Sequence, residues 1–264
     1  MDDQERVLRR DTFLGDAEAY LAARPGYPDA LIQAALEWAG LAEGDRILEV
    51  GCGTGEATVS LAGRGLRVVA LERSEAMAGL ARRRLAPYSG VDVRVADFED
   101  GPPAERFPAL VIATAYHWLD PVTRAGRCAD ALLDGGTLML LWHTHPPPYT
   151  GYHERSQPIY RSIVPDWEPP ATPGMSEARV AGIVEELAGS GRYEAVERRT
   201  QDWSQTYDRD LYLRLLSTYS DHRLLAEERR ARLFSELSAL IDAEFDGEVE
   251  RPYRTELILA QRGS

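Results

Sequence analysis

Short apolar runs alternate with amphipathic segments through the first 142 residues of the chain. The amphipathic segments have the spacing of helices, as in 74–85, where Ser74 is suited to cap the first turn. Near-continuous apolar strands separated by helical patterns are typical of a parallel sheet covered on both faces. The runs that we expect to form its strands are 46–50, 66–72, 91–97, 109–114 and 136–142.

The pattern changes after Trp142. Residues 143–175 hold eight of the sixteen prolines and show little periodicity, which favours an insertion or lid over a second sheet. Patterns of regular structure then return, with helices expected at 176–189, 208–219 and 226–243 and two late strands at 193–203 and 254–262. The sequence therefore predicts an α/β fold: a seven-stranded, mostly parallel sheet with helices on both faces and a C-terminal helical or lid insertion.

A glycine-rich turn follows the first predicted strand. The segment ILEVGCGTG places Gly51, Gly53 and Gly55 where the backbone can pass close to a ligand and a helix start presents its N–H groups. A dinucleotide fingerprint has the spacing G-x-G-x-x-G/A instead. Here the sixth position is Glu56, whose carboxylate would lie close to a pyrophosphate. The spacing disfavours an NAD(P)-dependent oxidoreductase, which stays as an alternative function.

Acidic residues end the second and third predicted strands. Glu72 lies 17 residues after Gly55, where a carboxylate can accept hydrogen bonds from both hydroxyls of a ribose. Asp97 and Phe98 end the third strand and are suited to an adenine amino group and to the face of its ring. With the glycine turn, these residues predict a site for a cofactor that contains a nucleoside.

ILEVGCGTG, Glu72 and the ADF segment together resemble the S-adenosylmethionine (SAM) site of the class I, Rossmann-like methyltransferases. The resemblance covers about residues 20–142 and the terminal strand. It implies SAM as cofactor, with the glycine turn along the methionine portion, Glu72 on the ribose and Asp97 on the adenine amino group. The cofactor-binding residues that it implies are Tyr20, Arg24, Glu49, Gly51, Cys52, Gly53, Thr54, Gly55, Glu72, Arg73, Met77, Asp97, Phe98 and Thr114.

The resemblance also implies how the chain is divided. Residues 1–142 would form a SAM-binding core with an N-terminal lid helix. Residues 143–253 would form a proline-rich lid insertion and a helical region on the substrate side, and 254–264 the final strand of the core.

A segment stiffened by Pro25 and Pro28 precedes the first strand. Such a segment can fold over the site, with Tyr20 or Tyr27 donating to the SAM carboxylate and Arg24 binding that carboxylate or an acidic substrate. A surface turn that packs elsewhere is the alternative.

The fourth predicted strand runs into AYHWLD (115–120). With RPGYP (24–28) and STYS (217–220), this segment resembles a bacterial group of small-molecule methyltransferases related to the trans-aconitate methyltransferases. His117 is the candidate catalytic residue, because an unperturbed pKa of about 6.5 suits proton acceptance or hydrogen bonding to an anion. The alternative is a histidine that ends the strand and packs on its neighbour. The residues expected on the substrate side are Tyr27, Trp118, Trp203, Tyr219 and His222.

Charge and composition exclude several classes of partner and of catalytic site. The formal net charge of −13 argues against a nucleic-acid partner, because most of the surface would repel a phosphate backbone. No run approaches about 18 uncharged apolar residues, so no membrane span is expected. The charged N-terminal segment does not look like a signal peptide, and we expect a cytoplasmic protein. The chain has no lysine, which excludes a P-loop and a pyridoxal-phosphate Schiff base. The sequence makes no prediction of oligomeric state.

Histidines and cysteines suggest two further kinds of chemistry. His143, His145 and His153 could ligate zinc, but no carboxylate or cysteine completes a familiar spacing, so we expect polar residues of a mobile lid and no metal. Cys52 and Cys128 are too few for a disulfide framework, and Cys52 is not expected to act as a nucleophile.

The sequence as a whole predicts SAM-dependent methyl transfer to a small soluble molecule at an O, N or C atom, with acids and phenols as one acceptor class. A carboxylate or phenolate needs no strong base, whereas an alcohol or amine would need one, for which His117 is the candidate. A non-catalytic SAM- or nucleotide-binding module is the second alternative. The intact glycine turn and Glu72 argue against it.

Overall fold

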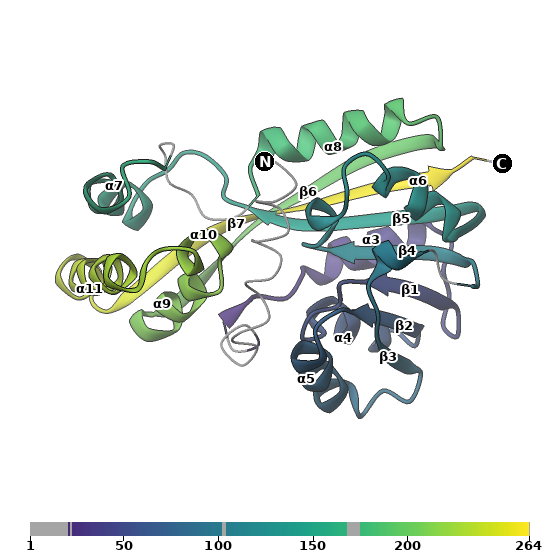
Figure 1. Ribbon diagram of the computed structural model, residues 1–264, viewed down its shortest axis with the longest axis horizontal. Helices are drawn as coiled ribbons and strands as arrows, with labels where there is room; N and C mark the ends of the chain where they lie inside the picture. The colour runs from purple at the N-terminus through teal and green to yellow at the C-terminus, as the bar shows by residue number, and fades with distance from the viewer. Residues whose placement is uncertain (1–20, 22, 102–103, 168–174, 264) are drawn as a thin grey trace. The chain divides into compact units, whose positions relative to one another are not determined.

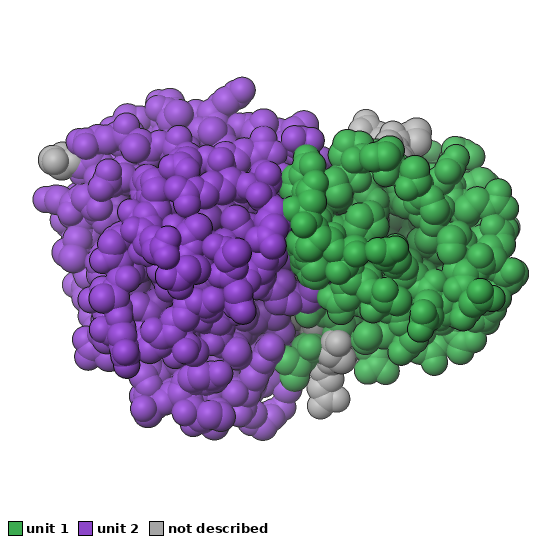
Figure 2. All heavy atoms as spheres, turned by 180° about the vertical axis from the view of Figure 1, so that it is seen from behind, with its two compact units in different colours: residues 1–24, 144–175, 202–254 green, residues 25–143, 176–201, 255–264 purple. Residues whose placement is uncertain are grey.

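The computed structural model describes residues 21, 23–101, 104–167 and 175–263. Within these ranges the chain forms two compact units, coloured separately in Figure 2. Unit 1 takes its described residues from 1–24, 144–175 and 202–254, and unit 2 takes them from 25–143, 176–201 and 255–264.

Seven strands form a sheet in the order β3-β2-β1-β4-β5-β7-β6 (Figure 1). The strands are β1 (Arg46–Val50), β2 (Arg67–Glu72), β3 (Val91–Val95), β4 (Phe107–Ala113), β5 (Leu132–Thr144), β6 (Tyr193–Asp208) and β7 (Glu248–Arg262). The helices of unit 2 are α3 (Asp29–Trp38), α4 (Glu56–Ala62), α5 (Glu75–Leu85), α6 (Arg124–Asp130) and α8 (Glu177–Gly189), with the 3-10 turns η2 (Phe98–Asp100) and η3 (Tyr116–Trp118). The predicted α/β class and seven-stranded sheet are confirmed.

Five neighbouring strands run parallel. β1 pairs in parallel with β2 and β4, β2 pairs with β3, and β4 pairs with β5. β7 runs opposite to β5, as the arrowheads in Figure 1 show, and the contacts of His143 with Thr255 and of Gly135 with Gln261 follow that antiparallel order. The sheet is therefore mixed. Its parallel strands end at one edge, where α/β folds bind their ligands.

Both faces of the central strands are buried, which explains their near-continuous apolar sequence. Ile47 and Leu48 are neighbours on β1 and therefore point to opposite faces, yet neither is exposed. Leu110 and Val111 on β4 repeat this arrangement. A strand in the middle of a covered parallel sheet needs apolar residues on both sides.

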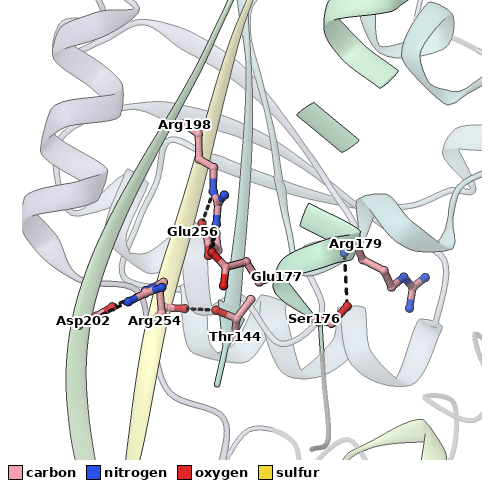
Figure 3. A network of polar contacts seen from close by, with 8 residues as sticks. All are labelled: Thr144, Ser176, Glu177, Arg179, Arg198, Asp202, Arg254 and Glu256. Atoms are coloured by element: carbon pink, nitrogen blue, oxygen red, sulfur yellow. Dashed lines mark hydrogen bonds and ion pairs between the residues drawn. The ribbon is translucent and has the colours of Figure 1, made fainter. Parts of the chain in front are cut away.

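Two helices of unit 2, α5 and α8, begin where the sequence indicates. The Ser74 hydroxyl accepts a hydrogen bond from the backbone N–H of Met77 at 3.3 Å, which confirms its predicted role as the cap of α5. Ser176 caps α8 in the same way, through the N–H of Arg179 at 3.3 Å (Figure 3). Each serine satisfies an N–H group that has no partner inside its helix.

Unit 1 contains α7 (Tyr152–Ile163), α9 (Arg209–Ser217), α10 (Ser220–Arg223) and α11 (Glu227–Glu244). α7 lies in the proline-rich stretch for which the sequence pattern indicates no helix, and Pro158 stands inside it. Tyr152, Tyr160 and Ile163 face the core of this unit, and that burial stabilises a helix with weak local signals. None of the helices in the described ranges is long and apolar enough to cross a membrane.

An ion pair with one fully buried partner joins β6 to β7. The Arg198 guanidinium donates to both carboxylate oxygens of Glu256 at 2.8 and 2.9 Å and also reaches Glu177 at 3.3 Å (Figure 3). The Glu256 side chain is 0% exposed, whereas that of Arg198 is 28% exposed. The pair therefore supplies the counter-charge that a buried carboxylate requires.

Loss of Arg198 should destabilise the protein more than loss of an exposed pair. We expect Arg198→Met to lower the free energy of unfolding by about 3 kcal/mol in urea denaturation, because Glu256 stays buried without its partner. Asp202→Asn is the matched control: the Asp202 carboxylate, which pairs with Arg254, is 58% exposed instead of fully buried, so the cost should stay below about 1 kcal/mol. Equal costs for the two variants would contradict this account of Glu256.

Candidate active site

The glycine turn between β1 and α4 is held against the end of β2 by backbone hydrogen bonds. The N–H groups of Gly51 and Cys52 both donate to the carbonyl of Leu71, at 2.8 and 3.0 Å. Gly51, Gly53 and Gly55 have φ angles of 70°, 58° and 91°, in the left-handed region that favours glycine. The alternate glycines of the sequence therefore follow from the path of this turn.

Gly51 also lies against the end of β4. A Cβ atom built on Gly51 would be 2.7 Å from the Cβ of Ala115, closer than real Cβ atoms approach one another. The turn and the segment after β4 are thus packed with no space for a side chain between them.

Glu72 ends β2 and joins the turn to the next helix. Its two carboxylate oxygens accept the N–H of Gly53 at 3.0 Å and the N–H of Ser74 at 2.8 Å. Burial raises the pKa of this carboxyl group, and the two N–H groups act in the opposite direction. A carboxylate accepts up to about four hydrogen bonds, so Glu72 can hold the turn and still accept two hydroxyl donors.

Glu49 lies beneath the turn at the end of β1 and is 1% exposed. Burial raises the pKa of its carboxyl group to about 7, and the nearby carboxylates of Glu56 and Glu72 add to the effect. Its Oε2 atom has no hydrogen-bond partner among the described residues. A buried carboxylate oxygen without a hydrogen-bond partner is suited to accept from a cationic group such as an ammonium.

The ends of β2 and β3 bring four more predicted cofactor residues together in this unit. Asp97 caps η2 by accepting the N–H of Glu99 at 3.0 Å, and its second carboxylate oxygen lies 3.5 Å from the Arg73 guanidinium. Met77 and Phe98 are buried. The Asp97 carboxylate is therefore already oriented by its own turn and by an arginine.

Thr54 forms a side-chain hydrogen bond with Glu56. Its hydroxyl donates to the Glu56 carboxylate at 2.7 Å, and Arg84 on α5 forms an ion pair with the same carboxylate. The amphipathic pattern of residues 74–85 does not indicate this partner for Arg84. The ion pair explains how the turn accommodates the acidic residue at its sixth position.

Tyr27 reaches the end of β4. Its hydroxyl lies 2.8 Å from the Thr114 hydroxyl, and its ring stacks on His143 with centroids 4.7 Å apart. Thr114 has φ 56°, a strained conformation for a β-branched residue. The structure thus brings two predicted site residues, Tyr27 and Thr114, into contact.

His117 lies on η3, just beyond β4, and packs on Trp118 with ring centroids 4.3 Å apart. The indole N–H of Trp142, near the end of β5, donates to its Nδ1 at 3.2 Å. An indole nitrogen only donates, so Nδ1 must carry the lone pair and neutral His117 carries its proton on Nε2. In this tautomer His117 offers a hydrogen-bond donor rather than a general base.

Comparisons with known proteins agree with this geometry. Residues 47–136 match a family model described as a methyltransferase domain. This segment is therefore similar to methyltransferase domains.

Two curated relatives and one solved structure illustrate the likeness. An uncharacterized methyltransferase of Mycobacterium tuberculosis is 34% identical over 140 residues, 52% of this chain. A protein-L-isoaspartate O-methyltransferase of Methylorubrum extorquens is 36% identical over 125 residues, 43% of this chain. Each alignment spans 55% of the relative's length. A SAM-dependent methyltransferase of Geobacter sulfurreducens, solved with S-adenosylhomocysteine, shares the fold at a TM-score of 0.51 and 16% identity, covering 91% of this chain and 93% of that one.

Four predicted residues lie in unit 1 and not in unit 2, which contains the residues that match a methyltransferase domain. Arg24 donates to the Thr218 hydroxyl at 2.9 Å, and its guanidinium lies 4.1 Å from the ring centroid of Tyr219. Trp203 and His222 pack in the same unit, and Tyr20 lies outside the described residues. The roles of these residues toward cofactor or substrate stay predictions.

The three histidines considered as zinc ligands have separate settings. His143 belongs to β5, while His145 and His153 lie with ring centroids 4.6 Å apart in unit 1. His153 is a buried residue of α7, and the assignment of this region to a lid stays a prediction. No group of three metal-ligating side chains occurs in the part of the chain that the structure describes.

The close approach at Gly51 predicts an unequal cost for two glycine substitutions. Gly51→Ala and Gly40→Ala both place alanine at a left-handed φ, which costs about 1–2 kcal/mol. Only the first also meets a neighbouring atom, since nothing lies within 4 Å of a Cβ on Gly40. We expect Gly51→Ala to cost at least about 1 kcal/mol more in urea denaturation. Equal costs would show that the packing against Ala115 is unimportant.

The raised pKa of Glu49 predicts a pH-dependent stability difference. Because the folded-state pKa, about 7, exceeds the unfolded value of 4.5, ionisation of Glu49 destabilises the fold as the pH rises through this window. Glu49→Gln should therefore gain stability relative to the wild type between pH 5 and pH 8, by up to about 3 kcal/mol. Urea denaturation at a series of pH values measures the difference, and a pH-independent difference would refute the shift.

Proposed function

We propose that the whole protein transfers a methyl group from SAM to a small soluble molecule. The observation that carries the proposal is the bonding of Glu72 to the glycine turn, at the edge of the parallel sheet where the methyltransferase domain would hold its cofactor. The match of residues 47–136 to a methyltransferase domain supports it. The residues present also fit SAM, because a buried acceptor near the end of β1, a left-handed glycine turn and a carboxylate bonded to that turn from the end of β2 occur in the same unit.

Each end of the cofactor would meet a different kind of group. Glu49 would compensate the positive charge of the methionine portion, and Gly51 to Gly55 would let the backbone run beneath it. Glu72 would accept the ribose hydroxyls, while Asp97 and the buried Phe98 would hold the adenine. Cys52, Thr54, Arg73, Met77 and Thr114 would complete this side, with Tyr20 and Arg24 as further candidates.

When bound, SAM supplies an electrophilic methyl group on a sulfonium and a neutral leaving group. The chain's own residues then have to orient the acceptor and exclude water, because in-line displacement depends on alignment. The Nε2–H of His117 would donate to an anionic acceptor and hold it in place. This tautomer suits a carboxylate or phenolate, which attacks with its own lone pair and needs no base.

The acceptor would be recognised by aromatic and polar side chains. Tyr27 and Trp118 in unit 2, and Trp203, Tyr219 and His222 in unit 1, are the candidates. We place the protein with the trans-aconitate-related group on the RPGYP, AYHWLD and STYS segments. On this proposal, 143–253 serves the substrate side, and the strand at 254–264 completes the core.

Isothermal titration tests the proposed cofactor directly. S-adenosylhomocysteine should bind the full chain, whereas NADH and NADPH should not. Binding of a nicotinamide cofactor without S-adenosylhomocysteine would instead support the oxidoreductase alternative.

Glu72→Ala should weaken the binding of S-adenosylhomocysteine by about 1.5–3 kcal/mol, because hydrogen bonds to a charged acceptor are lost. Glu75→Ala is the control, since Glu75 lies three residues further on and its side chain is 74% exposed. Unchanged affinity of the Glu72 variant in calorimetric titration would show that the ribose lies elsewhere.

His117 variants separate a donor from a base. If Nε2–H holds the acceptor, His117→Ala should slow methyl transfer about 10- to 100-fold, while His117→Gln, which keeps an N–H donor, should lose less than about 10-fold. Methyl uptake by acidic and phenolic acceptors measures the rates, and S-adenosylhomocysteine affinity serves as the control for folding. A Gln variant as slow as the Ala variant would favour the general base, and full activity of both would exclude a role for His117.

A further inference from the structure

Unit 1 contains a buried arginine without a carboxylate partner. Arg251 on β7 is 4% exposed, and it forms no ion pair with any carboxylate in the described ranges. Its guanidinium carbon lies 5.4 Å from the ring centroid of Tyr219 and 4.9 Å from that of Tyr253. Aromatic rings attract a cation, but they do not accept the N–H bonds of a guanidinium as a carboxylate does.

Polar atoms without partners collect around this arginine. Among the described residues, no hydrogen-bond partner exists for Arg251 Nε, Tyr152 Oη, His145 Nε2 or His222 Nδ1, all of them buried. Burial lowers the pKa of His145 and His222, and the positive charge of Arg251 lowers it further. Burial raises the pKa of the Tyr152 hydroxyl, and Arg251 acts in the opposite direction, so all three groups lie within the field of Arg251. Buried polar groups are nearly always paired, and four unpaired ones in a single unit indicate that a ligand completes them.

The charge of this group is positive at neutral pH. Burial and Arg251 lower the pKa of His145 to about 3, that of His153 to about 4 and that of His222 to about 3, so these histidines are neutral. Arg251 and Arg24, which share the ring of Tyr219, keep their charges. An uncompensated buried cation is costly, and a bound anion would remove that cost.

We propose that unit 1 binds a small organic carboxylate at Arg251. The guanidinium would donate to the carboxylate oxygens, the Tyr152 hydroxyl and His222 would supply further hydrogen bonds, and the rings of Tyr219 and Tyr253 would pack against the body of the ligand. The chemistry favours a carboxylate over a phosphate, because the donors are one buried guanidinium and neutral groups among aromatic rings. Tyr219 and His222 are also candidates for the acceptor side, so the use of the bound acid as an acceptor rests on the proposed function, whereas its binding can be measured without methyl transfer.

Thermal unfolding of the full chain with benzoate tests the site, with benzamide as the uncharged control of the same shape. Benzoate should raise Tm in a saturable way at constant ionic strength, and benzamide should not. Arg251→Met should abolish the benzoate shift and keep the shift caused by S-adenosylhomocysteine, which reports a folded unit 2. Arg155→Met is the matched control, because that arginine is exposed and paired with Glu244 in the same unit. It should respond to benzoate as the wild type does.

Tyr152→Phe keeps the ring and removes one donor, so it tests the site even if Arg251→Met does not fold. We expect benzoate affinity to fall about 10-fold, the scale of a hydrogen bond to a charged group. Three outcomes would overturn the proposal: equal shifts with benzoate and benzamide, a full benzoate shift in Arg251→Met, or a shift with inorganic phosphate and none with benzoate.

Discussion

The candidate site depends on the hydrogen bonds that hold the glycine turn to the end of β2. The N–H groups of Gly51 and Cys52 donate to the Leu71 carbonyl. The N–H of Gly53 donates to the side-chain carboxylate of the next residue, Glu72, which ends β2. These bonds fix the distance between the turn and the carboxylate that would hold a ribose. Left-handed φ angles make the path possible, and the contact with Ala115 leaves no room for a side chain at Gly51. A cofactor site of this kind is therefore rigid before a ligand arrives.

Unsatisfied buried atoms distinguish the two units. In unit 2, Glu49 presents a carboxylate oxygen that no described residue meets, in a setting that suits a cation. In unit 1, Arg251 Nε and the Tyr152 hydroxyl are donors that no described residue accepts, in a setting that suits an anion. Folding normally pairs such groups, because an unpaired buried polar atom costs about 1–3 kcal/mol. The opposite signs are consistent with a cationic cofactor in one unit and an organic acid in the other.

The chemistry of His117 shows how a neighbour far away in sequence sets a role. The AYHWLD segment indicates that His117 follows β4, but it does not distinguish proton acceptance from hydrogen bonding as the role of this side chain. The indole N–H of Trp142, on the adjacent strand β5, donates to the lone pair of His117 Nδ1. The proton of neutral His117 is then on Nε2, which favours the role of hydrogen-bond donor. No pattern in the sequence pairs residues 117 and 142. Their contact exists because β4 and β5 are neighbours in the sheet.

The sequence by itself determined the α/β class, all seven strands and the glycine turn, because strand burial and left-handed turns leave strong local patterns of apolar residues and glycine. The tertiary structure alone decided the existence of α7, whose proline-rich sequence is stabilised by burial in unit 1. It also decided the partners of Arg84 and Trp142 and the aromatic surroundings of Arg251, three residues that no motif marks. Local signals reflect backbone preference and the face that a residue presents. Which side chains meet across the fold depends on strand order and packing, and a linear pattern does not contain these.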